Sequence, residues 1–102
     1  MDRIAMLKEI LADSPNDAFA RYGLAMEYAK AGDVEAALAE YKRILETNPD
    51  YTPAYQMAGQ MLMERGRTDE ARKLLSDGIA SARRAGNQHA ATEMQGMLDI
   101  LG

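Results

Sequence analysis

Few side chains in this sequence have the types and spacing that enzymes use for catalysis. The chain has one histidine, His89, and no cysteine, so it offers neither a thiol nucleophile nor a ligand cluster for zinc. Asp33 and the Asp69-Glu70 pair come where helices are expected to start, and carboxylates there favour the positive end of the helix dipole. We therefore predict no catalytic residues, no metal and no cofactor, in a protein that is not an enzyme.

The charge pattern argues against nucleic acid as a partner. The net charge is -4 at pH 7, whereas a nucleic-acid-binding protein usually shows a basic patch. The densest basic stretch, within residues 64–73, is interleaved with acids and is expected to be a solvated face. No apolar run approaches the roughly 18 residues that a membrane helix needs, and the N-terminus is charged too early for a signal peptide. We expect no nucleic acid, no membrane and a cytoplasmic location.

Helix-forming residues dominate the chain, and strand patterns are absent. Five breaks rich in glycine, proline, asparagine and aspartate separate six expected helices. These helices are placed at 2–13, 17–31, 34–47, 52–65, 68–84 and 88–101. Because short linkers force neighbouring helices to lie antiparallel and in contact, the predicted fold class is all-α, built from antiparallel helix hairpins.

The breaks contain residues that end one helix and begin the next. Gly32 and Gly66 can adopt the left-handed conformation that closes a helix C-terminus. Asp33 and Thr68, directly after them or nearly so, are expected to cap the following helices by accepting free backbone N–H groups. These positions predict two tight turns between paired helices.

A period of 34 residues organises these elements. Gly32 and Gly66 are one period apart, and so are Pro15 and Pro49, each of which keeps the preceding residue out of the helical conformation. A period near 34 is typical of helical-hairpin repeats. We predict one domain over 1–102, in which the first and last helices are unpaired. Its parts are a half-repeat helix at 2–15, repeats at 18–51 and 52–85, and a C-terminal capping helix at 88–101.

These positions resemble the tetratricopeptide repeat, which combines large, small and aromatic residues at fixed offsets with a closing proline. In the first full repeat the matching positions hold Arg21, Leu24, Ala25, Tyr28, Gly32, Ala37, Tyr41, Ile44 and Pro49. In the second they hold Tyr55, Ala58, Gly59, Leu62, Gly66, Ala71, Leu75, Gly78 and Arg83. Arg21 stands where the pattern has a large aromatic residue, and Arg83 stands where it has the closing proline. Because that proline is missing, the fifth helix is expected to run on toward Gly86. The resemblance implies an α-α superhelix of about six helices.

The resemblance also implies a concave groove lined by the first helix of each hairpin. The candidate groove residues are Phe19, Tyr22, Met26, Lys30, Gln56, Gln60 and Met63. Phe19, Tyr22 and Met26 also share one stripe of their helix, nearly opposite a second apolar stripe. A helix that is apolar on two faces is either sandwiched or carries a binding surface. The alternative is that Phe19 and Tyr22 cover the unpaired first helix.

The predicted function is a protein-interaction or scaffold module that binds a protein or peptide segment in this groove. Some members of the family hold a C-terminal carboxylate with lysine and asparagine. The matching positions here hold Tyr22, Met26 and Met57, so such a clamp is not expected. The alternative function is self-assembly into a homodimer or larger oligomer through the unpaired terminal helices.

Overall fold

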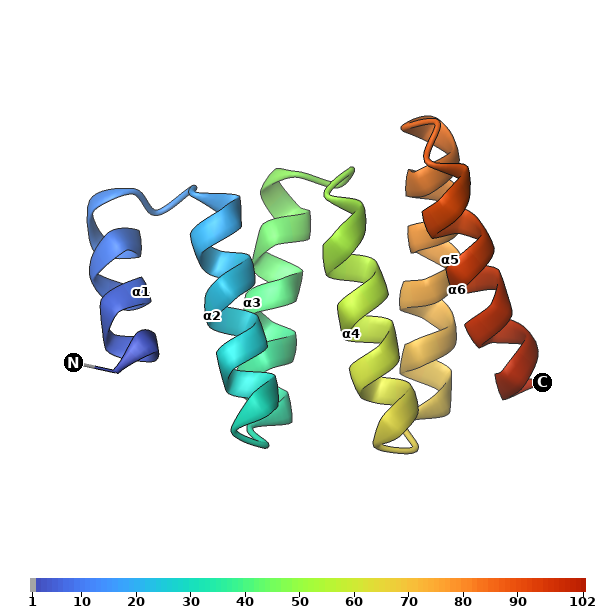
Figure 1. The fold of residues 1–102 in the computed structure, drawn as a ribbon, viewed down its shortest axis with the longest axis horizontal. Helices are drawn as coiled ribbons and strands as arrows, with labels where there is room; N and C mark the ends of the chain where they lie inside the picture. The colour runs from blue at the N-terminus through green and yellow to red at the C-terminus, as the bar shows by residue number, and fades with distance from the viewer. Residues whose placement is uncertain (1) are drawn as a thin grey trace. The chain divides into compact units, whose positions relative to one another are not determined.

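The computed structural model describes residues 2–102, which form six α-helices and no strand (Figure 1). The helices are α1 Arg3–Asp13, α2 Ala18–Lys30, α3 Val34–Thr47, α4 Thr52–Glu64, α5 Thr68–Arg84 and α6 Gln88–Leu101. They divide into two compact units, the first ending at Asn48 and the second beginning at Pro49. The predicted all-α fold of helix hairpins is confirmed, and every predicted helix end lies within about one residue of the observed end.

Polar residues stand directly before most of the helices. Asp2, Asp17 and Asp33 are the N-caps of α1, α2 and α3, and Asn87 is the N-cap of α6. In each cap the side-chain oxygen accepts a hydrogen bond from the backbone N–H three residues on, over 2.8 to 3.2 Å. Each bond satisfies an N–H group that has no partner inside the helix, which contributes about 1 kcal/mol.

The turns at Gly32 and Gly66 end one helix and fix where the next begins. Both glycines have a positive φ, 85° and 73°, which residues with a Cβ rarely adopt. In both turns the N–H of the next residue donates to the carbonyl oxygen five residues before it, over 2.9 Å. That geometry makes Arg67 the N-cap and Thr68 the first residue of α5. The prediction that Thr68 caps this helix is therefore wrong.

Because arginine has no side-chain acceptor, α5 begins without the cap that Asn87 gives to α6. Replacing Arg67 with asparagine should add a cap worth about 1 kcal/mol and remove an ion pair with Glu70 worth a few tenths. We expect the free energy of unfolding, measured in urea, to rise by about 0.5 kcal/mol. The reverse exchange, Asn87→Arg, is the matched control and should lower it by about 1 kcal/mol. A less stable Arg67→Asn protein would mean that the Glu70 pair outweighs the cap.

Prolines end two helices, and the absence of one lengthens a third. The residues before Pro15 and Pro49 leave the helical conformation, with φ of -133° and -143°, as predicted. Arg83 stands where the repeat pattern has a proline, and α5 continues through it to Arg84. The turn at Gly86 then ends the helix, so the expectation of a longer fifth helix is confirmed.

In the first unit, α2 packs against both α1 and α3 (Figure 1). Leu7 and Leu11 of α1 form a buried cluster with Ala20 and Leu24 of α2. Burying a leucine side chain contributes about 2 kcal/mol, so this small cluster is what holds α1 on the hairpin. The buried side of α2 is thereby fixed, and its remaining surface is left for other contacts.

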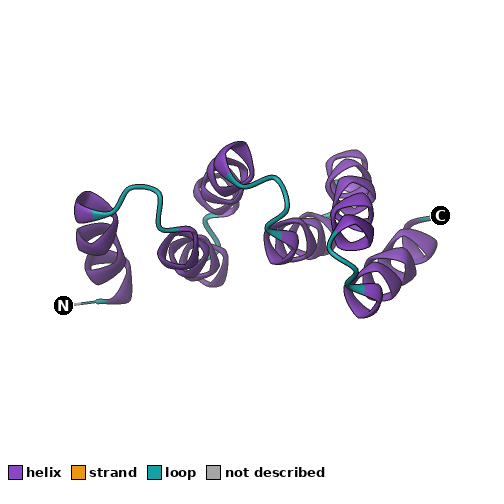
Figure 2. Ribbon diagram, turned by 90° about the horizontal axis from the view of Figure 1, so that it is seen from above, coloured by secondary structure: helices purple, strands orange, loops and turns teal. Residues whose placement is uncertain are grey.

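In the second unit, α5 lies against both α4 and α6 (Figure 2). Gly59 of α4 and Gly78 of α5 face their neighbours so closely that an added Cβ would come within 2.6 Å of a side-chain atom. The hydroxyl groups of Thr52 and Ser81 form a buried hydrogen bond of 3.0 Å between α4 and α5. Close approach of the helices in this unit therefore depends on small residues at their contacts.

Candidate functional site

The structure places four of the predicted groove residues on α2, in the first unit: Phe19, Tyr22, Met26 and Lys30. Phe19 is 80% exposed and Met26 is 39% exposed, so both apolar side chains reach the surface. These two residues are seven apart, close to two helical turns, and therefore lie on the same side of α2. The helix thus carries apolar surface outside the side that it buries against α1.

Gly23 lies between Phe19 and Met26 on this side of α2 and has no side chain. Its position is four residues after the phenylalanine and three before the methionine, so all three share one face. A Cβ added at Gly23 would meet the two methyl groups of Leu7 at 3.5 and 3.6 Å and the Arg3 guanidinium at 4.0 Å. The surface at Gly23 is therefore bordered by an apolar side chain and, at its edge, by a cation, both from α1. We call the surface of Phe19, Gly23 and Met26 the α2 notch.

Tyr22 packs against α3. Its ring stands edge-on to the buried ring of Tyr41, with the centroids 6.1 Å apart and the planes at 61°. Such aromatic pairs contribute about 0.5 to 1.5 kcal/mol beyond the burial of their area. Phe19, in turn, is too exposed to cover α1. The structure therefore does not favour the alternative in which both residues serve to cover the first helix.

The other three predicted groove residues lie on α4, in the second unit: Gln56, Gln60 and Met63. All three side chains are half-buried, and their spacing of four and three residues places them on one side of the helix. The Gln60 amide donates a hydrogen bond of 3.1 Å to the Glu64 carboxylate one turn on. This face of α4 offers mainly polar contacts. That it forms one groove with the face of α2 stays a prediction.

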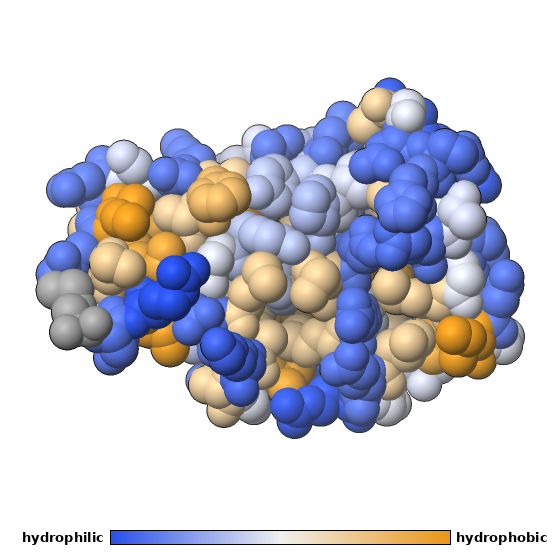
Figure 3. Space-filling model, viewed as in Figure 1, coloured by the Kyte–Doolittle hydropathy of each residue, from blue (hydrophilic) through white to orange (hydrophobic). Residues whose placement is uncertain are grey.

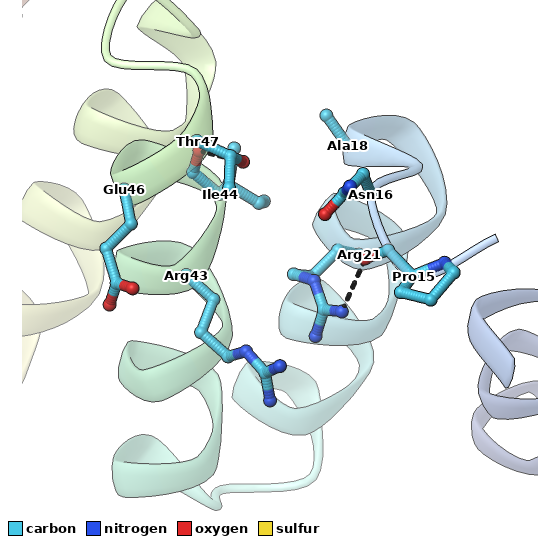
Figure 4. A pocket seen from close by; sticks show the side chains of 8 residues that line it. All are labelled: Pro15, Asn16, Ala18, Arg21, Arg43, Ile44, Glu46 and Thr47. Carbon is cyan, nitrogen blue, oxygen red and sulfur yellow. Dashed lines mark hydrogen bonds between the residues drawn. The ribbon is translucent and has the colours of Figure 1, made fainter.

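A cavity of about 130 Å³ opens in the first unit beside the α1–α2 loop and the end of α3 (Figure 4). Its lining consists of Pro15, Asn16, Ala18, Arg21, Arg43, Ile44, Glu46 and Thr47. Arg21 and Arg43 bring positive charge to it, and Glu46 brings negative charge. The mixture favours neither an anion nor a cation as a ligand.

Arg21 has a structural role beside this cavity. Its side chain is only 11% exposed, pairs with Glu40 of α3 and donates a 2.8 Å hydrogen bond to the carbonyl oxygen of Pro15. The guanidinium therefore ties the α1–α2 loop and α3 to α2 at a position where the repeat pattern has a large aromatic residue. The departure at Arg21 was visible in the sequence, but nothing there identified Glu40 as its partner.

Two further apolar side chains, Met6 and Ile10 of α1, are exposed and were not singled out by sequence reasoning. They are 44% and 42% exposed, and Figure 3 shows hydrophobic atoms gathered over α1 and the start of α2. One period on, the same positions hold Glu40, which pairs with α2, and Ile44, which is buried. The period could have revealed them, because it aligns α1 with a helix that normally packs on both sides.

The described part of the chain is residues 2–102. Within that range, no three histidine, aspartate or glutamate side chains lie close enough together to hold a metal ion. His89 is 87% exposed on α6 and contacts Glu93 over 2.7 Å, as expected of a solvated helix residue. None of the six helices is both long enough and apolar enough to span a membrane.

Comparison with known proteins agrees with this architecture. A model of the tetratricopeptide repeat matches residues 4–58 and also residues 28–93. A TPR repeat-containing protein of Pseudomonas aeruginosa is 32% identical over 88 residues, which cover 86% of this chain and 84% of that protein. Together the two matches to the family model cover residues 4–93, which include both hairpins.

Solved structures show the same fold. A tetratricopeptide repeat domain protein from Salinibacter ruber is 36% identical, with a TM-score of 0.79 over 85% of this chain and 88% of that one. The TPR2B domain of yeast Sti1, in its complex with pHsp70, has a TM-score of 0.87 over 96% of this chain and 78% of that one. At 18% identity, the second likeness concerns the fold alone. The chain belongs to the tetratricopeptide repeat family of protein-interaction modules.

Proposed function

We propose that this interaction module binds an extended or helical peptide segment of a protein partner, and that the α2 notch receives one apolar side chain of that segment. The observation that carries the proposal is the exposed ring of Phe19 one turn from Gly23, where the absence of a side chain leaves Leu7 of α1 within reach of the surface. Burying a phenylalanine or methionine side chain contributes about 1.5 to 3 kcal/mol. Aromatic anchors next to a pocket are also where binding energy concentrates in protein interfaces.

The other candidate residues would set the register of the peptide. Lys30 ends α2 as an exposed cation and can pair with an acidic side chain of the segment. We propose that Gln56 and Gln60 of α4 hydrogen-bond its backbone and that Met63 adds apolar contact. Tyr22 supports the surface through its packing on Tyr41.

The kind of peptide follows from what the surface lacks. The positions that grip a terminal carboxylate in some relatives hold Tyr22, Met26 and Met57, which carry no cationic or amide donor. We therefore propose contact with an internal segment of the partner. The complex of the Sti1 domain with pHsp70 supports peptide binding only as something this fold permits. A cytoplasmic location, and the exclusion of nucleic acid as a partner, stay predictions.

The test uses peptides selected against the wild-type protein from a displayed random library. We expect Phe19→Ala to weaken their binding by about tenfold or more, because the anchor is lost. Gly23→Ala should fill the notch with a methyl group at ordinary contact distance from Leu7. It should also stabilise α2 by up to about 1 kcal/mol. Weaker binding by a more stable protein would separate a binding defect from a folding defect.

The matched control is Ile100→Ala, which removes another exposed apolar side chain, on α6. It should leave peptide affinity unchanged. Amide chemical shifts on peptide addition should change along residues 19–30. Unchanged affinity in both Phe19→Ala and Gly23→Ala, or shifts confined to other helices, would show that the α2 notch is not the binding surface.

Self-assembly through the terminal helices is the second candidate function, and the structure favours it at α1. Met6 and Ile10 are exposed there, whereas the exposed side chains of α6 are mainly polar. Apolar surface that persists on a helix is typical of an interaction site. We propose α1, and not α6, as the helix through which copies would associate.

A further inference from the structure

We infer that the exposed face of α1 pairs with the same face of α1 in a second copy of this chain, with the two helices antiparallel. The inference rests on the self-assembly candidate above, and not on the proposal that the α2 notch binds a peptide. The face consists of Arg3, Met6, Ile10 and Asp13, and we call it the α1 face. Its spacing of three, four and three residues places all four on one side of the helix.

The order of residues along the α1 face is self-complementary. Its two apolar residues, Met6 and Ile10, lie in the middle, and a cation and an anion lie at the ends. A two-fold axis through the middle of the face sets Met6 of one copy opposite Ile10 of the other. The same axis sets Arg3 opposite Asp13, and each pairing occurs twice. A two-fold interface requires this kind of self-matching surface.

The charged residues Arg3 and Asp13 lie at the ends of α1 where the dipole of that helix disfavours their charges. Arg3 is in the first turn, where the helix dipole disfavours a cation, and Asp13 is in the last turn, where it disfavours an anion. Glu27 contacts Arg3 over 3.5 Å, but the Arg3 side chain remains 60% exposed and its guanidinium has further donors. Asp13 is exposed. An antiparallel second α1 would bring the opposite charge to each end.

The surface of α6 gives no comparable match for head-to-tail stacking. Its polar side chains pair along the helix, Gln95 with Asp99 over 3.1 Å and His89 with Glu93 over 2.7 Å. Ile100 is the large hydrophobic side chain exposed on this helix. Stacking α6 on α1 would place Met6 and Ile10 against polar groups of α6. Those polar groups would lose their hydration without gaining hydrogen-bond partners, which is unfavourable. Pairing of two α1 faces instead buries apolar side chains against apolar side chains.

The size of the α1 face sets the strength of the dimer. A helix of 11 residues is about 16 Å long, and one helix face is smaller than the roughly 800 Å² per partner of a typical stable interface. We therefore expect a reversible dimer that forms at high protein concentration. Sedimentation equilibrium from about 10 μM to about 1 mM covers the range that such a small interface requires.

The first pair of variants locates the interface. Ile10→Glu should weaken dimerisation by at least about tenfold, because the symmetric dimer loses two buried isoleucine side chains. Ile100→Glu makes the same chemical change on α6 and should leave the dimerisation constant unchanged. Circular dichroism at low concentration should show that both variants stay folded, since both positions are exposed in the chain.

The second set of variants tests the antiparallel register. Arg3→Asp and Asp13→Arg should each weaken dimerisation several-fold, because each places like charges opposite one another twice. Combining them in one chain restores opposite charges at both ends of the pair. The double variant should therefore regain dimerisation to within about threefold of wild type, a coupling that two independent surface changes would not show.

The outcomes separate the register from the wider idea of self-assembly. A protein that stays monomeric over the whole concentration range contradicts both self-assembly and the antiparallel register. The α1 face would then be left for a different partner. Dimerisation that survives Ile10→Glu would contradict only the assignment of the interface to the α1 face. Loss of dimerisation in Ile100→Glu would indicate head-to-tail stacking. Failure of the double charge reversal to restore association overturns the antiparallel pairing. Peptide affinity measured at low micromolar protein should be unchanged in Ile10→Glu and Ile100→Glu, whereas Arg3→Asp also alters the cation at the edge of the α2 notch.

Discussion

Replacing Gly78 with alanine should lower the free energy of unfolding by about 2 kcal/mol, against the usual preference of helices for alanine. A Cβ at Gly78 would lie 2.6 Å from the Cβ of Tyr55 and 2.6 Å from the Met94 sulfur. Tyr55 is held at its far end by a 2.7 Å hydrogen bond from its hydroxyl to the Pro49 carbonyl oxygen. Met94 is fully buried. Neither neighbour can move away without disturbing the contacts among α4, α5 and α6.

The magnitude comes from two opposed effects. Alanine gains about 1 kcal/mol over glycine in a helix interior, and forcing an extra methyl group into a packed core costs about 1 to 3 kcal/mol. The upper end applies here because one clash is with an atom next to the Tyr55 backbone. The overpacking term should therefore exceed the gain in helix propensity.

Gly96→Ala is the matched control for this prediction. Gly96 also lies inside a helix, α6, but an added Cβ there has no neighbour within 4 Å. The variant should be more stable than wild type by about 1 kcal/mol. Urea denaturation followed by circular dichroism gives both values. If Gly78→Ala were stabilised as much as Gly96→Ala, the close packing of the second unit would be wrong.

The helix boundaries were predictable because they depend on local chemistry. Gly32 and Gly66 supply a backbone conformation that other residues avoid, and Pro15 and Pro49 exclude the helical conformation from their neighbours. The misplaced cap at Thr68 shows the limit of this reasoning. Whether a residue is the N-cap depends on the hydrogen bonds of the preceding turn, and these put Arg67 there. The division into repeats at 18–51 and 52–85 stays a prediction.

The candidate surfaces were predictable only in part, since exposure depends on contacts between helices. The stripe of Phe19 and Met26 is visible in the sequence, and the structure leaves both side chains exposed. The notch between them was not visible, because its floor is Leu7 of another helix. Ile10 is likewise chemically identical to Ile44 one period on, yet only Ile44 is buried. The exposure of Ile10 therefore depends on the place of α1 in the repeat pattern and not on the chemistry of the residue itself.

Alkaline pH should destabilise the chain through Tyr41. Burial disfavours the charged phenolate, and the neighbouring Tyr22 adds repulsion, so the pKa of Tyr41 rises from 10.0 to about 12. Between these values the folded chain keeps a proton that the unfolded chain releases. The contribution of Tyr41 to the free energy of unfolding is therefore intact below pH 10, declines as the pH rises toward 12, and is lost above pH 12. The full loss is about 3 kcal/mol.

Tyr41→Phe removes this titration and isolates its contribution. Urea denaturation at several pH values from about 9 to about 12 should show wild type losing about 3 kcal/mol more than the variant. The pKa of Tyr55 is also raised, chiefly by burial and then by the charge of Asp77. That residue remains in the variant, so the variant should keep a smaller decline of the same sign. Parallel profiles for the two proteins would mean that Tyr41 ionises in the folded chain as easily as in the unfolded one. The ring of Tyr41 would then be reached by water, and its packing against Tyr22 beneath the proposed peptide surface would be looser than the 6.1 Å pair implies.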